Sequence, residues 1–167
     1  MNYSALETDI NYISDAKFID TGVTKKIAAS DIRQELQHVR SFPSGVRNCY
    51  RINVTSGAKY LIRASFYYGN YDDLNEPPQF DLHFGANVWD TVKFSTNLSD
   101  ITDSEIIYTP SQDHIQPCLV NTGKGTPFIS VIELRTLNNK VYVTNSAKSI
   151  LSTLRRSDVG SIANEYR

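Results

Sequence analysis

The chain has 167 residues, of which 40% are hydrophobic and 21% are charged, a composition typical of one globular domain with a sizeable core. Its 17 Lys and Arg residues are balanced by 18 Asp and Glu residues, so it lacks the basic surplus that binds nucleic acid, and we expect no nucleic-acid partner. No apolar run of about 18 residues occurs, which predicts no direct membrane insertion by this chain, and its first residues lack the pattern of a signal peptide.

The first third of the chain carries short and mixed patterns. Residues 13–19 and residues 49–54 are predicted as short strands. Between them, residues 31–39 are predicted to form one or two helical turns. A Ser-Gly pair at residues 56–57 marks a turn before the next segment.

The clearest alternation of apolar and polar residues lies in residues 60–68. Every second residue of this stretch, ending at Tyr68, falls on one apolar face. Arg63, Ser65 and Tyr67 fall on the opposite face. The pattern predicts a half-buried strand with Tyr68 toward the core and Tyr67 on the outer side.

Further short strands are predicted through the second half of the chain. Apolar residues alternate with polar ones in residues 80–84 and again in residues 128–135, where Glu133 is expected to point outward. Residues 147–154 carry the apolar spacing of a short helix, but the segment is so short that an extended conformation is equally open. Many short strands with Gly and Pro turns between them predict a single all-β domain, an antiparallel β-sandwich or barrel. The remaining strand candidates are residues 91–94, 106–108 and 115–120.

Cys49 and Cys118 are the only cysteines, and each lies in a strand-like segment. From the sequence alone, two buried free thiols and one disulfide are both open interpretations. A disulfide requires Cα atoms within about 7 Å and an oxidising compartment. Three Asn-x-Ser/Thr sequons, at Asn2, Asn53 and Asn97, are candidate glycosylation sites and favour a secreted setting.

Motifs for catalysis or metal binding are weak. Residues 123–126 (GKGT) lack the full phosphate-loop pattern and favour a hairpin turn. The three histidines are not spaced as metal ligands, and no serine lies in a nucleophile motif. The carboxylates of Asp72, Asp73 and Glu76 could hold Ca²⁺, but without a regular Ca²⁺-loop pattern they favour a solvated loop. We therefore expect no metal, no cofactor and no enzyme activity.

Ten short segments form an ordered series along the chain. They include YLIRASFYYGNYD at residues 60–72, GANVW at residues 85–89 and CLVNTG at residues 118–123. The others are residues 10–15, 18–22, 40–43, 48–50, 78–82, 126–130 and 133–135. In order and spacing, along most of the chain, this series resembles the malectin-like domain that plant receptor-like kinases carry outside the membrane.

The resemblance implies an antiparallel β-sandwich of the jelly-roll, galactose-binding type that acts as a non-catalytic extracellular recognition module. It also implies one module over residues 1–155, without its opening strand, and a linker over residues 156–167 toward a missing second module. In such receptors the module lies on the extracellular face of the plasma membrane, and kinase activity resides in a domain absent from this chain. The expected partner is a glycan or a secreted peptide, with a co-receptor protein as a further candidate.

Aromatic and acidic residues near the end of the alternating stretch form the candidate ligand site, because aromatic rings stack on sugar C–H faces and carboxylates accept hydrogen bonds from hydroxyl groups. The candidate residues are Tyr67, Tyr71, Asp72, Asp73 and Trp89. The alternative for the tyrosines is packing toward the core, and Trp89 is favoured as a cap of the sandwich. Two rival functions are a structural domain that associates receptors without a small ligand, and a glycan-processing enzyme, which would need two carboxylates about 5–10 Å apart across a cleft.

Overall fold

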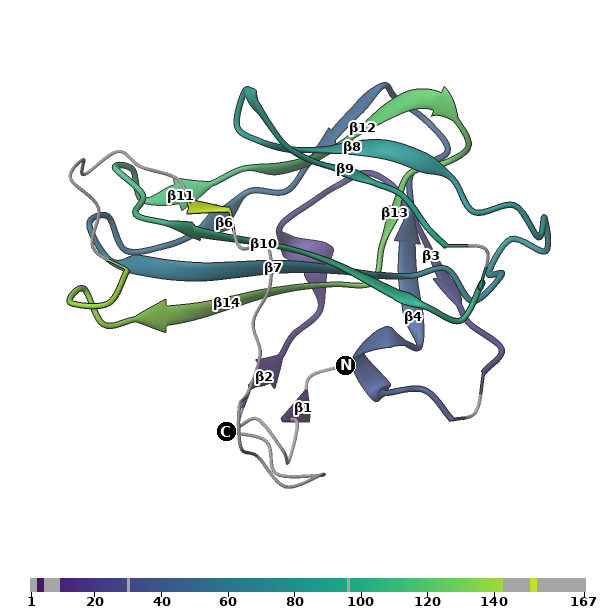
Figure 1. Ribbon diagram of the computed structural model, residues 1–167, viewed down its shortest axis with the longest axis horizontal. Coiled ribbons are helices and arrows are strands. Elements are labelled where there is room, and N and C mark those ends of the chain that lie inside the picture. The colour runs from purple at the N-terminus through teal and green to yellow at the C-terminus, as the bar shows by residue number, and fades with distance from the viewer. Residues whose placement is uncertain (1–2, 5–9, 30, 96, 143–150, 153–167) are drawn as a thin grey trace.

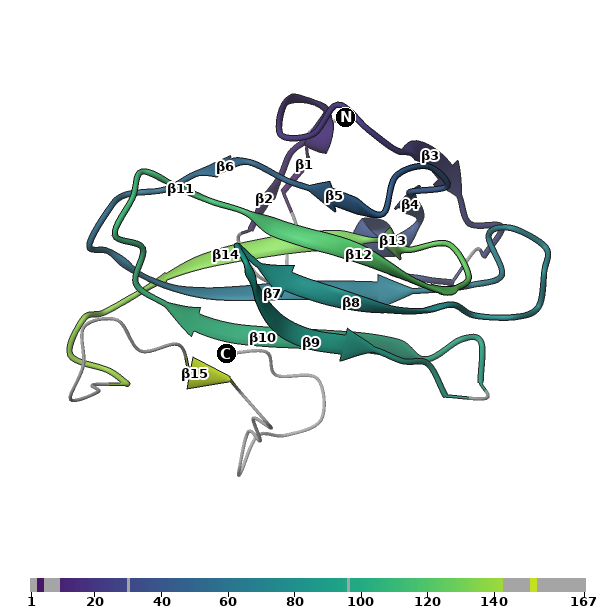
Figure 2. The same ribbon diagram turned by 90° about the horizontal axis from the view of Figure 1, so that it is seen from above.

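The computed structural model describes residues 3–4, 10–29, 31–95, 97–142 and 151–152. Two four-stranded antiparallel sheets lie over one another with the main core between them, which confirms the predicted all-β antiparallel class (Figure 1). The view from above shows the strands of the two layers running in similar directions, as in aligned sandwiches (Figure 2). No helix in the described part of the chain is long and apolar enough to cross a membrane.

The first sheet has the strand order β14-β7-β10-β15, and the second has the order β5-β12-β8-β9. The strands of the first sheet are β14 (Val131–Leu137), β7 (Lys59–Tyr67), β10 (Ile101–Tyr108) and β15 (Leu151–Ser152). Those of the second are β5 (Arg47–Cys49), β12 (Pro117–Lys124), β8 (Gln79–Phe84) and β9 (Asn87–Val92).

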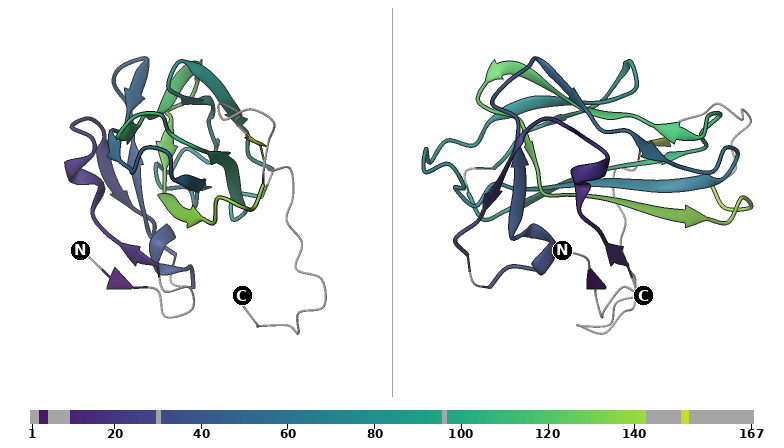
Figure 3. Two further views of the ribbon diagram at one scale, coloured as in Figure 1. Left: turned by 90° about the vertical axis from the view of Figure 1, so that its left-hand side faces the viewer. Right: turned by 180° about the vertical axis from the view of Figure 1, so that it is seen from behind.

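Smaller elements complete the fold. A three-stranded sheet crosses one end of the sandwich in the order β13-β4-β3, and a pair of N-terminal strands lies beside the main body (Figure 3). These strands are β13 (Phe128–Ile129), β4 (His38–Ser41), β3 (Val23–Lys26), β1 (Tyr3–Ser4) and β2 (Asn11–Tyr12). A two-stranded sheet joins β11 (His114–Ile115) to β6 (Ile52–Asn53), and the 3-10 turns are η1 (Asp15–Lys17) and η2 (Gln34–Leu36).

Strand β8 follows its sequence pattern, because Phe80, Leu82 and Phe84 are buried while the residues between them are half-exposed. Strand β7 departs from its pattern. Tyr67, predicted on the outer face, is only 8% exposed, because Gly69 lies against its ring and the residue belongs to the same buried cluster as Ile27. A central strand covered on both faces loses the alternation of exposure that a half-buried strand shows.

The predicted strand over residues 128–135 is two strands. β13 pairs with β4 and β14 pairs with β7, so the chain changes sheets at Ser130. The Ser130 hydroxyl accepts a hydrogen bond from the Tyr67 backbone N–H at 3.0 Å, which fixes the crossing. Glu133, predicted outward, is 7% exposed because the Tyr12 hydroxyl and the Arg135 guanidinium bind its carboxylate.

Other predicted boundaries shift or change type. Residues 13–19 contain η1 instead of a strand, and residues 31–39 contain only η2 and the start of β4. Residues 49–54 are interrupted between β5 and β6. In residues 147–154, for which a short helix and an extended conformation were both open, residues 151–152 form strand β15. The rest of that segment lies outside the described residues, as does the predicted linker 156–167.

A disulfide joins Cys49 of β5 to Cys118 of β12, with a Cα–Cα distance of 4.0 Å. The two residues are direct partners in the antiparallel register. The structure thus decides between the two interpretations that the sequence left open, and it confirms the predicted Cα separation of less than about 7 Å.

Asp15 anchors the N-terminal segment to β4. Its carboxylate forms an ion pair with Arg40, with an Nε–Oδ2 distance of 2.5 Å, and accepts a hydrogen bond from the Tyr50 hydroxyl at 3.0 Å. Burial acts to raise the pKa of Asp15, but the hydrogen bonds and charge of Arg40, together with the Tyr50 hydroxyl, hold this pKa below its usual value. The depressed pKa couples folding to acid pH.

We expect the contribution of Asp15 to be complete above about pH 4 and to disappear as the pH falls further, because the unfolded chain then binds a proton that the folded chain resists. Asp15→Asn should therefore flatten the acid side of a plot of unfolding free energy against pH, measured by urea denaturation. The nearby exposed Asp20 provides the control Asp20→Asn, which should keep the slope of the unmodified protein. Identical slopes for the two variants would contradict this assignment.

Candidate functional site

The loop over residues 69–78 joins β7 to β8 at one end of the sandwich and carries most of the predicted ligand residues. Its first residue, Gly69, donates a backbone hydrogen bond to the Leu98 carbonyl at 3.2 Å, which ties it to the β9–β10 connection. At its far end, Pro78 lies so close to Gly125 that a side chain on the glycine would come within 2.7 Å of the proline Cβ. Neighbouring connections therefore hold both ends of this loop, which we call the rim loop.

Tyr68 organises the rim loop from below. Its ring is fully buried, as the sequence predicts, and lies 6.1 Å from the Phe128 ring between ring centroids. Its hydroxyl donates to Asp72 Oδ1 and accepts from the Glu76 backbone N–H at 3.3 Å. Burial, the hydrogen bond to Asp72 and the Asp72 charge all raise the pKa of Tyr68, so the hydroxyl stays protonated. A buried phenol thereby positions both halves of an exposed loop.

Asn70 and Asn75 close the rim loop on itself. The Asn70 side-chain oxygen accepts from the Asn75 backbone N–H at 2.8 Å, and its amide donates to Asn75 Oδ1 at 3.0 Å. Asn70, Asp73 and Asn75 all have positive φ angles, of 52°, 60° and 54°. Asn and Asp tolerate this left-handed backbone better than other non-glycine residues, which explains why they occupy these positions.

Tyr71 is partly buried instead of projecting from the loop. Its ring centroid lies 5.0 Å from that of Phe128 and 5.6 Å from that of Tyr68, and its hydroxyl lies 3.2 Å from Ser41 Oγ. Burial raises the pKa of Tyr71 to about 12, and the Ser41 hydrogen bond acts in the opposite direction. Together with the burial of Tyr67, this leaves the rim without the pair of projecting rings that the sequence suggested.

The part of the rim loop that meets solvent is acidic. Asp73, Leu74, Asn75 and Glu76 are exposed, Leu74 at 69%, and Asp72 is half-exposed. Residues 69–78 contain three carboxylates and no basic residue. The described residues contain no group of three or more His, Cys, Asp or Glu side chains placed to hold a metal ion. The rim therefore offers negative charge around one exposed leucine.

Trp89 lies elsewhere on the sandwich. It is partly buried in β9, beside a break in the β8–β9 register, and its ring packs edge-on against Phe84 with centroids 5.9 Å apart. Phe84 is the last residue of β8, whereas the rim loop precedes the first residue of that strand. The structure thus groups Tyr71, Asp72 and Asp73 in one loop and places Trp89 toward the opposite end.

Two of the three sequons can be located. Asn53, in β6, and Asn97, in the β9–β10 connection, are both exposed. The Asn97 side-chain amide donates to Asp100 Oδ1 at 2.7 Å. Asn2 lies outside the described residues. Glycosylation at these three positions stays a prediction.

Sequence reasoning missed the residues that shape the rim. The sequence pattern predicts Tyr68 in the core without a role for its hydroxyl, marks Asn70 only as part of a turn and does not single out Asn75. The sequence carries one signal for the shape of this loop. Residues 69–78, GNYDDLNEPP, are rich in Gly, Asn and Asp, which adopt the left-handed backbone conformation most readily.

The malectin-like domain family matches the chain over residues 1–167. A probable leucine-rich-repeat receptor-like serine/threonine-protein kinase of Arabidopsis thaliana is 49% identical to it over 163 residues, which are 96% of this chain and 19% of the kinase. The chain thus spans about a fifth of the length of this curated relative and covers only its malectin-like region.

Among solved structures, that of the plant receptor-like kinase FER matches this chain with a TM-score of 0.74 and 17% sequence identity. The match covers 92% of this chain and 44% of the FER chain. A second structure, of the plant peptide RALF23 in complex with FER and LLG2, matches with a TM-score of 0.62 and 17% sequence identity. This match covers 79% of this chain and 37% of the matched chain. At such identities the likeness shows the fold, a β-sandwich shared with receptor ectodomains.

Proposed function

Because the chain belongs to the malectin-like domain family, we propose that it is a non-catalytic recognition module from the extracellular part of a plant receptor-like kinase, and that its rim loop binds a secreted basic peptide. The observation that carries the proposal is the rigid, acidic rim loop. A receptor kinase of this kind would convert binding outside the cell into kinase activity inside it, in a domain that this chain does not cover.

Pre-organisation supports a binding role for the rim loop. When a flexible loop becomes ordered on a ligand it loses conformational entropy. The loss weakens binding by about 0.5–1.5 kcal/mol for each immobilised side chain. Tyr68, Asn70 and Asn75 already hold the loop through hydrogen bonds, so less of this cost remains at binding. The loop thus resembles a prepared contact surface more than a passive connection.

The charge of the rim loop favours a peptide over a sugar as its ligand. Three carboxylates without a basic neighbour in the loop attract a cationic partner, and such attraction speeds encounter. The tyrosine rings that a sugar would need for stacking are occupied by core packing. The RALF23 complex shows a peptide assembled with a receptor of this fold, which supports a peptide as the class of ligand.

Receptor association is the second candidate function. Leu74 is 69% exposed in the middle of the acidic rim, and an apolar residue surrounded by polar ones is typical of the centre of a protein–protein contact. The FER complex also includes a second protein, LLG2, which supports a protein partner for this module.

We expect Asp73→Asn combined with Glu76→Gln to weaken the binding of a basic peptide by about 5- to 10-fold at low salt, because two exposed carboxylates lose their charge. Asn keeps the left-handed backbone at position 73 favourable. Isothermal titration of the unmodified chain and the variant with RALF23, with synthetic basic and acidic peptides, and with oligosaccharides measures the effect.

Asp20→Asn combined with Asp31→Asn removes the same charge from two exposed positions outside the rim loop and is the matched control. It should leave peptide affinity unchanged. Equal affinity of the rim variant and the control would remove the rim loop from the proposal. Binding of an oligosaccharide at the rim loop, with no peptide bound, would replace the peptide by a glycan.

A further inference from the structure

Strand β3 is an open edge of the small sheet that crosses one end of the sandwich. The strand order is β13-β4-β3, so β3 pairs with β4 on one side, and no other strand in the described part of the chain pairs with it (Figure 1). All four of its residues, Val23–Lys26, are exposed, and Val23 is exposed at 48% although it is apolar. The described residues therefore leave this edge accessible.

The register determines which backbone groups of β3 face the open edge. In an antiparallel pair, residues that exchange hydrogen bonds with the partner strand alternate with residues whose N–H and C=O groups point away from it. The Ile27 N–H donates to the Gln37 carbonyl at 2.9 Å, in the position that continues the β3–β4 register. In steps of two from Ile27, Lys25 and Val23 also bond to β4.

The other side of β4 leads to the same assignment. The Phe42 N–H donates to the Pro127 carbonyl at 2.8 Å, in the position that continues the β13–β4 register. The even-numbered residues of β4 therefore bond to β13, which leaves its odd-numbered residues for β3. The open edge of β3 thus presents the N–H and C=O groups of Thr24 and Lys26, about 7 Å apart along the strand.

The side chains beside this edge are basic. Lys25 and Lys26 are exposed, and neither forms an ion pair within the part of the chain that the structure describes. Arg40, on the neighbouring strand, is already paired with Asp15. Because successive side chains of a strand point to opposite faces, the two lysines place one positive charge on each face of the edge.

We propose that the open edge of β3 binds an extended, acidic segment of a partner protein, which adds a fourth strand to this sheet in the order β13-β4-β3-partner. Strand addition to an exposed sheet edge takes its affinity from main-chain hydrogen bonds and its specificity from alternate side chains. Thr24 and Lys26 supply the hydrogen bonds, and carboxylates of the partner opposite Lys25 and Lys26 complete the charge pairs. An apolar side chain opposite Val23 covers its exposed surface.

The same lysines disfavour a second copy of this chain as the occupant. A two-fold antiparallel pairing of β3 with β3 that uses both outward positions sets Thr24 of one copy opposite Lys26 of the other. The two Lys25 side chains then lie directly opposite each other, and like charges at such a position destabilise the pairing. Lysines on an edge strand prevent association of this kind, whereas an acidic strand turns the repulsion into attraction.

The β3 edge and the rim loop adjoin but attract opposite charges. Ile27, the residue after β3, lies so close to Gly69 that a side chain on the glycine would come within 2.7 Å of Ile27 Cγ2. The rim loop carries three carboxylates and no basic residue, whereas β3 carries two lysines and no carboxylate. Binding of an acidic strand at β3 therefore does not depend on binding of a basic peptide at the rim loop.

Amide hydrogen exchange of the ¹⁵N-labelled full chain, followed by NMR, tests the edge before and after a ligand is added. In the free chain we expect slow exchange at Lys25 and Ile27, which bond to β4, and fast exchange at Thr24 and Lys26. The probe is an acetylated and amidated octapeptide of valine and threonine with two adjacent glutamates. We expect a Kd of about 0.1–1 mM, the range of a short contact. At a peptide concentration ten times Kd, exchange at Thr24 and Lys26 should slow about tenfold.

Thr24→Pro removes an outward N–H that takes no part in the β3–β4 hydrogen bonds, and proline is tolerated on an edge strand where its nitrogen faces solvent. It should weaken binding at least about tenfold with an unchanged urea midpoint, while Thr24→Val, the matched control, should bind as the unmodified chain does. Lys25→Gln combined with Lys26→Gln should weaken binding about 5- to 10-fold at low salt. Lys93→Gln combined with Lys140→Gln, at exposed positions on other segments, should not.

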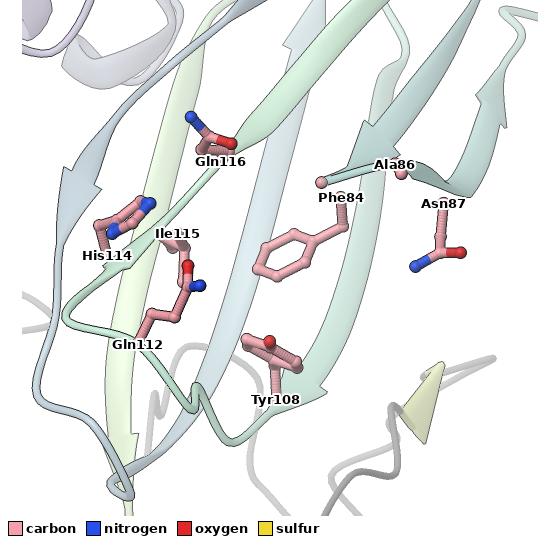
Figure 4. Close-up of a pocket in the computed structure, with 9 residues that line it drawn as sticks. Phe84, Ala86, Asn87, Tyr108, Gln112, His114, Ile115 and Gln116 are labelled. Atoms are coloured by element: carbon pink, nitrogen blue, oxygen red, sulfur yellow. The ribbon is translucent and has the colours of Figure 1, made fainter.

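A distant part of the sandwich provides an internal reference. A small open pocket of about 180 Å³ lies between the β8–β9 turn, the end of β10 and the segment before β12, and Phe84, Tyr108 and Gln116 are among the residues that line it (Figure 4). Strand β11, which also lines it, lies at the opposite end of the molecule from β3 (Figure 1). The amides of the pocket should not respond to the acidic peptide.

Several results would overturn the proposal. They are equal binding of a peptide with lysines in place of the glutamates, equal binding of an acidic peptide N-methylated at alternate residues, and protection at the rim loop or the pocket in place of β3. Slow exchange of all four β3 amides in the free chain would show that the edge is already covered. Protection that grows with chain concentration, without peptide, would assign the edge to a second copy instead. Because the rim-loop variant Asp73→Asn with Glu76→Gln leaves β3 intact, failure of the basic-peptide hypothesis is distinguishable from failure of this one.

Discussion

Phe128→Ala is expected to lower the free energy of unfolding by about 3–5 kcal/mol, because it removes the ring around which the aromatic core is built. Phe128 is fully buried, and its ring contacts five other aromatic rings with centroid separations between 5.0 and 6.3 Å. The five are Phe66, Tyr68, Tyr71, Phe80 and Phe94. Since domains are stable by only about 5–15 kcal/mol, this loss removes a large part of the total.

Urea denaturation measures the effect of Phe128→Ala, and Phe94→Ala is the matched control. Phe94 is partly exposed, and the rings it contacts are those of Tyr68 and Phe128. We expect its removal to cost less than half as much. Equal losses for the two variants would contradict the central place of Phe128. Because Tyr68 and Tyr71 rest on Phe128, the same variant should also loosen the rim loop, seen as faster amide exchange at residues 69–78.

Removal of the disulfide should destabilise the chain by about 4 kcal/mol in the chain-entropy model, because the bond closes a segment with a sequence separation of 69. We expect Cys49→Ala combined with Cys118→Ala to move the urea midpoint down accordingly. Alanine avoids placing a hydroxyl at Cys118, which is 1% exposed.

The control for the disulfide is chemical reduction. The unmodified chain in reducing buffer should unfold at the urea concentration that unfolds the double variant, whereas the double variant should respond little to the reductant. An unmodified chain that keeps its midpoint after complete reduction, confirmed by thiol counting, would show that the bond contributes nothing to stability.

Local alternation predicted strands well where one face of the strand stayed open. β8 follows its pattern because its outer residues, such as Asp81, remain half-exposed. The same rule was wrong for Tyr67 and Glu133, which the sequence placed on an outer face. Other segments cover that face: Ile27 joins Tyr67 in one buried cluster, and the Tyr12 hydroxyl bonds to the Glu133 carboxylate. Such covering depends on residues about 40 and 120 positions away and leaves no trace in a local pattern.

The candidate site was predicted in part. The sequence located the acidic loop that carries Tyr71, Asp72 and Asp73, because turn-forming residues and carboxylates stand together there. It also grouped Trp89 with this loop, whereas the ring packs on Phe84 toward the other end of β8. One strand, β8, lies between the rim loop and Trp89, and a strand carries the chain from one end of a sandwich toward the other, so the strand predicted over residues 80–84 already separated the two places.

Composition and period-2 patterning were sufficient for the all-β class, and the series of family segments was sufficient for the malectin-like family, since both are written in consecutive residues. The pairing of Cys49 with Cys118, the change of sheets at Ser130 and the meeting of Phe84, Tyr108 and Gln116 around one pocket arise only when distant strands come together. Packing is a property of side chains from several segments at once, and a one-dimensional pattern records only neighbours along the chain.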